Sequence, residues 1–205
     1  MTELFISAFV TLFVVIDPVG VAPIFGGLTS GASAAQARAM AIRASLISAV
    51  ILLLFAVLGQ PLLGALGIGL DSFRIAGGIM LFLIALEMVF EKRTQRREQR
   101  AEKLREAHVE DVSVFPLAIP MIAGPGAIAT VMLLMARARD GGETLVVLGA
   151  LALVLALTAA ALLAARPMMR LLGVRAEAVV TRLLGVILAA LAAQYVVDGL
   201  KSAFA

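Results

Sequence analysis

A polar break inside the first apolar segment holds the residues with the greatest capacity for chemistry. It contains Asp17, Pro18, Gly20 and Pro23. Both prolines lack an N–H group and clash with the carbonyl four residues earlier, so a regular helix cannot continue unchanged. Because hydrocarbon offers no partner for the freed backbone groups, such a break is tolerated only where it faces protein or a wet cavity. A carboxylate at this depth is a candidate for binding a substrate or carrying a proton.

A second break of the same kind lies near residue 124, where Gly124, Pro125 and Gly126 follow one another. N-termini of half-helices present free N–H groups that suit a carboxylate, whereas unwound carbonyls and helix C-termini suit an ammonium group or a cation. The two breaks therefore predict a site for a small zwitterion. The candidate substrate-binding residues are Asp17, Pro18, Gly20, Gly124, Pro125, Gly126 and Thr130.

Each candidate also has a plainer interpretation. Asp17 precedes a proline and could simply cap the helix that follows. The glycines could serve close packing between helices. Thr130 could donate to a carbonyl of its own helix.

The composition predicts an integral membrane protein. The chain has 205 residues, of which 62% are hydrophobic, and a mean hydropathy of +1.06, against about 45–50% apolar residues in soluble domains. It has no cysteine and one histidine, which excludes disulfides, thiolate chemistry and a multi-histidine metal site within one chain. We expect no cofactor and no metal. The basic residues lie between apolar segments, so we expect the lipid bilayer as a partner and no nucleic acid.

Segments of about 20 apolar residues can each cross a membrane, and the pattern predicts an all-α protein with six such spans. A charged connector, 91–111, follows the third span, and its alternating charges predict a solvated helical extension of that span. The six spans are 4–28, 41–63, 73–90, 112–136, 145–165 and 179–200.

The distribution of Lys and Arg predicts the orientation, because cytoplasmic loops are enriched in both residues. With both termini on the outer, periplasmic side, only Arg74, Arg137, Arg139 and Lys201 of the 17 Lys and Arg residues fall outside. We therefore expect a multi-pass protein of the bacterial inner membrane with both termini outside.

An internal repeat relates the two halves of the chain. Gly20 and Gly126 lie 106 positions apart, and so do Pro61 and Pro167. Since each half holds an odd number of spans, the second half must enter the membrane from the opposite side, as in many secondary transporters. The sequence thus predicts two inverted three-helix repeats with broken first helices: residues 1–90 and 112–205, joined by the connector 91–111.

Two arginines also correspond in this repeat. Arg74 and Arg182 begin the third and sixth spans. Each could pair or extend toward the membrane surface, or the two could form a gating or structural pair.

At these motifs the chain resembles the MarC family, also called the six-span neutral amino-acid transporter family. The stretches that carry the resemblance are 16–25, 73–82 and 115–128, and the similarity runs from end to end. Family motifs often have Asn after the first glycine, where this chain has Val21. The resemblance implies an inner-membrane protein that transports small neutral amino acids such as glycine and alanine.

Taken together, these features predict a secondary transporter or exporter of small neutral amino acids with substrate bound between the breaks. Proton or cation coupling is a further possibility through Asp17. The alternatives are a channel or a transporter for another small solute, or a non-transporting membrane protein. We do not expect an enzyme, because the sequence contains no clear catalytic pair and no nucleotide-binding motif.

Overall fold

A computed structural model describes the backbone of residues 1–106 and 111–204. Within these ranges it describes all side chains except those of residues 94, 100, 101, 103–106, 166 and 168–178. The described residues form helices and connecting segments, with no strand among them. The elements are α1 (Thr2–Ile16), α2 (Pro18–Leu28), α3 (Ala34–Ala65), α4 (Leu70–Val89), α5 (Lys92–Glu106), η1 (Ser113–Ile122), α6 (Pro125–Arg137), α7 (Gly141–Leu163) and α8 (Ala165–Ala203).

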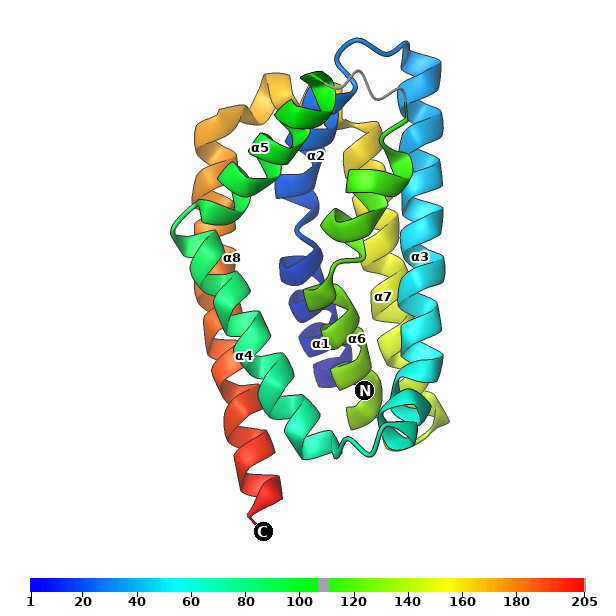
Figure 1. The fold of residues 1–205 in the computed structure, drawn as a ribbon, viewed down its shortest axis with the longest axis vertical. Helices are drawn as coiled ribbons and strands as arrows, with labels where there is room; N and C mark the ends of the chain where they lie inside the picture. The colour runs from blue at the N-terminus through cyan, green and yellow to red at the C-terminus, as the bar shows by residue number, and fades with distance from the viewer. Residues whose placement is uncertain (107–110, 205) are drawn as a thin grey trace.

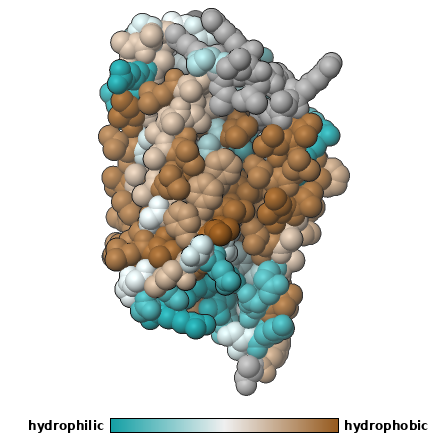
Figure 2. Space-filling model, turned by 180° about the vertical axis from the view of Figure 1, so that it is seen from behind, coloured by the Kyte–Doolittle hydropathy of each residue, from teal (hydrophilic) through white to brown (hydrophobic). Residues whose placement is uncertain are grey.

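The predicted all-helical membrane architecture is confirmed in its coarse form. Five stretches are long and apolar enough to cross a membrane, and the bent pair of η1 and α6 adds a sixth. These stretches coincide with the six predicted spans to within a few residues at most ends. Figure 2 shows apolar residues as a band across the middle of one face, with hydrophilic residues gathered below it. Leu46, Val50 and Val57 of α3 are among the exposed apolar side chains, as expected for helices that contact lipid.

The interrupted first span lies at the centre of the bundle. In its most apolar window 56% of the residues are buried, compared with 28% in α3 and α4. α1 packs against α6 and α7, and α2 packs against α7 and α8. Figure 1 shows that the chain passes upward through α1 and α2 and downward through η1 and α6, so the two interrupted spans run in opposite directions.

α4 and α8 pack closely along their length because glycines line their interface. A Cβ atom at Gly78 would lie 2.9 Å from the carbonyl oxygen of Ala192, and one at Gly199 would lie 3.0 Å from that of Asp71. Small residues at such contacts let two helix backbones approach each other within a membrane. This helix pair forms one wall of the bundle, on the left in Figure 1.

The predicted extension of the third span is wrong. Glu91 has a φ of 59°, which ends α4, and α5 then runs at a steep angle across the upper end of the bundle (Figure 1). α5 contacts α2, α4 and η1. Two of its arginines point into the protein, as described below, so this helix is only partly solvated. Residues 107–110 of the predicted connector lie outside the described residues.

Candidate functional site

The first break is organised by Asp17. Its backbone has φ 60° and ψ 64°, a left-handed conformation that is uncommon except in Gly, Asn and Asp. Its N–H group ends α1 by donating to the carbonyl of Phe13 at 2.9 Å. Its carboxylate accepts from the N–H of Gly20 at 3.1 Å, and Pro18 occupies the first turn of α2. Asp17 therefore caps α2, as the plainer interpretation of this residue predicted.

Gly20 makes room for that carboxylate. A Cβ atom at this position would lie 2.3 Å from Oδ2 of Asp17. Pro18 and Gly20 are both buried, and neither lines the cavity described below. The structure therefore gives both residues a role in shaping the break.

The second break separates η1 from α6. η1 is an irregular segment with wide helical hydrogen bonds, such as that from the N–H of Ala123 to the carbonyl of Ala118 at 2.9 Å. Gly124 precedes α6 with an extended backbone, Pro125 begins the helix, and the two segments meet at a bend of 51°. A Cβ atom at Gly124 would lie 2.3 Å from the carbonyl oxygen of Pro120, so any larger residue would force the bend to open.

The rest of the predicted second-break set is close-packed. A Cβ atom at Gly126 would lie 2.4 Å from Cδ1 of Ile84 and 3.5 Å from Cγ1 of Val15. Thr130 is fully buried and donates to the carbonyl of Gly126 at 2.8 Å. Its hydroxyl is therefore held by its own helix.

An arginine from α5 joins the two breaks. Nη1 of Arg97 lies 2.9 Å from Oδ2 of Asp17, and Nη2 makes a longer contact of 3.5 Å with the carbonyl oxygen of Met121, just before the second break. The side chains of Arg97 and Asp17 are only 10% and 2% exposed. At such burial each charge requires the other, since an unpaired ion is strongly destabilising.

Arg93, one turn earlier on α5, reaches the end of α1. Its Nη2 donates to the carbonyl oxygen of Val15 at 2.7 Å, and its Nη1 lies 3.1 Å from the sulfur of Met88. Burial, and then the neighbouring charge of Arg97, lower the pKa of the Arg93 guanidinium to about 9. It is therefore still a cation at neutral pH.

The end of α1, α5 and the second break border a partly open cavity of about 310 Å³. Its walls come from the end of α1, from α4, from the inner face of α5 and from the second break with the first turn of α6. Glu87 also faces it and lies 2.8 Å from Nη1 of Arg96. The lining residues are Val15, Ile84, Glu87, Arg93, Arg96, Arg97, Pro120, Met121, Ile122, Gly124, Pro125, Gly126 and Ala127.

Arg74 and Arg182 are not brought together. Arg74 lies 3.4 Å from Asp71 in the first turn of α4, whereas Arg182 pairs with Glu91 just beyond the last turn. The two arginines thus stabilise opposite ends of the α4–α8 pair, and neither lines the cavity.

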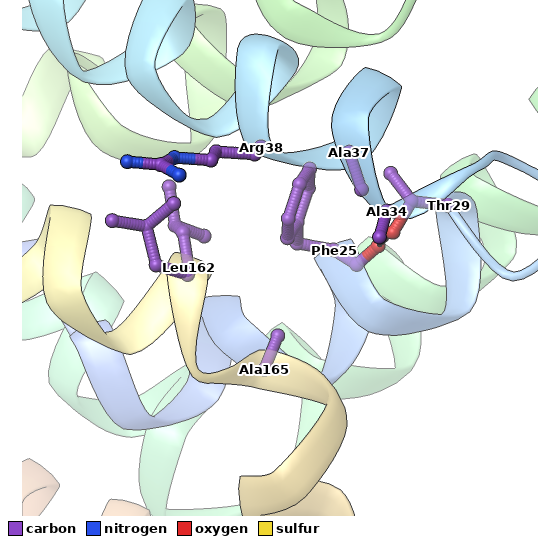
Figure 3. Close-up of a pocket in the computed structure, with 8 residues that line it drawn as sticks. Phe25, Thr29, Ala34, Ala37, Arg38, Leu162 and Ala165 are labelled. Atoms are coloured by element: carbon purple, nitrogen blue, oxygen red, sulfur yellow. Dashed lines mark hydrogen bonds between the residues drawn. The ribbon is translucent and has the colours of Figure 1, made fainter.

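A second cavity, of about 330 Å³, lies between α2, α3 and the end of α7. Figure 3 shows Phe25, Leu162 and Ala165 around it, with the Arg38 side chain extended along one side. Its lining is mostly apolar and includes no residue of either break. The sequence did not predict this second cavity.

Sequence reasoning missed the four charged residues that face the first cavity: Glu87, Arg93, Arg96 and Arg97. One available signal was the carboxylate of Asp17, since a buried charge within a membrane almost always has a partner. A second was the spacing of Arg93 and Arg97, which puts both on one face of a helix.

Comparison with known proteins agrees with this architecture. The profile of "MarC family integral membrane protein" matches residues 2–204. A "UPF0056 membrane protein" of Methanocaldococcus jannaschii is 37% identical over 203 residues, which cover 98% of each chain. The "UPF0056 membrane protein YvbG" of Bacillus subtilis is 37% identical over 205 residues, 100% of this chain and 97% of the relative. The "UPF0056 membrane protein YhcE" of Escherichia coli is 36% identical over 197 residues, 96% and 92% of the two chains. No solved structure matches. The chain therefore belongs to the MarC family of integral membrane proteins.

Proposed function

We propose that this protein is a secondary transporter or exporter of small neutral amino acids, of the glycine and alanine type. The observation that carries the proposal is the cavity where two oppositely directed, interrupted spans meet. Interrupted helices at corresponding positions are typical of substrate sites in secondary transporters. With a volume of about 310 Å³, the cavity is at the small end of the range for ligand pockets, which favours a ligand of few atoms.

The chemistry of the cavity suits a carboxylate. The first N–H groups of α6 have no acceptor within their own helix, and the positive end of the helix dipole lies there. Gly124, Pro125 and Gly126, at the start of this helix, line the cavity. The other predicted site residues lie behind this surface and fix its shape. They are Asp17, Pro18, Gly20 and Thr130.

We further propose that the two halves are inverted repeats that rock about the cavity. The opposite directions of the two interrupted spans support this arrangement (Figure 1). Both termini lie at the lower end of the molecule in Figure 1, away from α5. By the distribution of Lys and Arg, the end that carries α5 is the cytoplasmic one, and the membrane is the bacterial inner membrane.

Uptake by proteoliposomes tests the transport proposal. We expect saturable uptake of labelled glycine and alanine, and acceleration of that uptake by unlabelled alanine on the opposite side. Lysine is expected to be a poor substrate, since its extra cation would approach the three arginines of the cavity. Protein-free vesicles provide the control. Absence of both uptake and counterflow for every small neutral amino acid would contradict the proposal.

A channel, or a transporter of another small solute, is the alternative that the same cavity supports. The uptake and counterflow assays distinguish a channel from a transporter of another solute. A flux that rises linearly with concentration, without counterflow, identifies a channel. Saturable flux of a different solute identifies another substrate.

Proton coupling through Asp17 is a separate hypothesis. In the structure this carboxylate pairs with Arg97 and accepts from the N–H of Gly20. If coupling operates there, an imposed pH gradient should accelerate alanine uptake, and the Asp17→Asn variant should lose this acceleration. A variant that retains the wild-type pH response would exclude Asp17 as the proton carrier.

A further inference from the structure

The groups that an ammonium ligand would need between the breaks are occupied by the chain itself. The carbonyl of Val15 accepts from Arg93 at 2.7 Å. The carboxylate of Asp17 accepts from Arg97 at 2.9 Å, and the carbonyl of Met121 lies 3.5 Å from the same guanidinium. An incoming amine would therefore have to displace a cation that is covalently part of the protein.

Among the described residues, the charged side chains around the cavity include more cations than carboxylates. Arg97 is paired with Asp17, and Arg96 is paired with Glu87. Arg93 contacts only a carbonyl oxygen and a thioether sulfur, and no third carboxylate pairs with it in the described part of the chain. Arg93 is thus a half-buried cation that interacts at longer range with the charges of Asp17 and Glu87 but has no direct carboxylate partner among the described residues, and an anion in the cavity would supply one.

The same cavity wall includes the start of α6, whose positive dipole end favours an anion. Arg93 and this helix start both line the cavity. A carboxylate placed between them would accept hydrogen bonds from a charged donor, which are among the stronger ones in proteins.

We propose that the cavity recognises its ligand through a carboxylate, that Arg93 is the residue that determines this specificity, and that the ligand's amino group adds little to binding. This inference rests on the proposed function for the location of the site. It extends that function by predicting that small carboxylates without an amino group also bind.

Alanine and two related ligands test the inference by equilibrium binding to the full chain in lipid nanodiscs, measured by calorimetry or ligand-observed NMR. Propionate lacks the amino group of alanine, and ethylamine lacks the carboxylate. We expect propionate and alanine to bind within about threefold of each other, with no detectable binding of ethylamine. Ethylamine that binds as well as alanine, or propionate that does not bind, would overturn the inference.

Variants of Arg93 identify the cation. Arg93→Gln is expected to weaken propionate binding by about ten- to a hundredfold, the worth of a charge-assisted hydrogen bond, whereas Arg93→Lys should retain most of the affinity. Arg43→Gln is the matched control, because it removes an arginine whose exposed ion pair with Asp111 lies outside the cavity. Unchanged propionate affinity in Arg93→Gln would refute the assignment. If that variant fails to fold, the Lys variant decides the question: more than about tenfold loss with the cation retained would contradict it.

These outcomes are distinguishable from failure of the transport proposal. Binding is measured at equilibrium without flux, so propionate can bind through Arg93 even if the vesicles show no uptake of glycine or alanine. Conversely, uptake of alanine combined with failure of propionate to bind would retain the transporter and discard the carboxylate site.

Discussion

Replacing Asp17 with asparagine is expected to lower the stability of the folded protein by about 3 to 5 kcal/mol, the usual cost of removing one partner of a buried ion pair. Asparagine tolerates the left-handed backbone and can still accept from the N–H of Gly20, so the variant removes the charge and keeps the cap. Arg97, whose side chain is 10% exposed, is then left without its anion. Thermal unfolding in detergent, followed by loss of the monodisperse peak in size-exclusion chromatography, measures the effect.

Two further variants show whether the loss of stability is specific to the buried ion pair. Glu87→Gln removes the carboxylate of a pair whose side chains are 27% and 58% exposed, and exposed pairs contribute about 1 kcal/mol or less. The double variant Asp17→Asn with Arg97→Gln should recover part of the lost stability, because it leaves no uncompensated charge. Equal destabilisation by the Asp17 and Glu87 variants would show that the buried pair contributes no more to stability than the exposed pair does.

Replacing Gly124 with alanine is expected to abolish transport and to lower stability by about 1 to 3 kcal/mol, the cost of overpacking. The backbone angles of Gly124, φ −81° and ψ 171°, are acceptable for alanine, so only the contact matters. The new Cβ would lie 2.3 Å from the carbonyl oxygen of Pro120, a backbone atom that cannot rotate away. The bend must therefore open and move the start of α6. Proteoliposome uptake and thermal unfolding report the two effects.

Gly149→Ala is the matched control for this substitution. Gly149 is exposed in the middle of α7, and a Cβ there meets nothing within 4 Å. Alanine should leave transport unchanged and stabilise the helix by up to about 1 kcal/mol. Wild-type transport by Gly124→Ala would show that the second break does not shape the substrate site.

The spans and the breaks at Pro18 and Pro125 could be predicted because local rules decide them, whereas the expected interruption at Pro23 is wrong, since α2 continues through that residue. Apolar length sets the number of crossings, and Pro18 and Pro125 each begin a new helix at the predicted point. The cap formed by Asp17 follows from the same local chemistry. Gly124 was also identifiable, since glycine before proline marks a break whatever surrounds it.

The position of α5 could not be predicted in this way. Its charge pattern is that of a solvated helix, and the pattern alone does not show which arginines face inward. Its direction depends on Glu91 adopting a left-handed turn, which nothing in the local sequence requires. The contacts of Arg93 and Arg97 with residues about 80 positions earlier result from tertiary packing, so the cation-lined wall of the cavity emerged only from the structure.

The distance along the chain between Asp17 and Arg97 has a consequence for biosynthesis. The carboxylate precedes its guanidinium partner by 80 residues, and chains are made from the N-terminus. While the nascent chain is short, the opening segment carries an acid that hydrocarbon disfavours. The first span can therefore reach its stable position in the bilayer only after α5 has left the ribosome. The segment that is translated first is thus among the last to adopt its final structure.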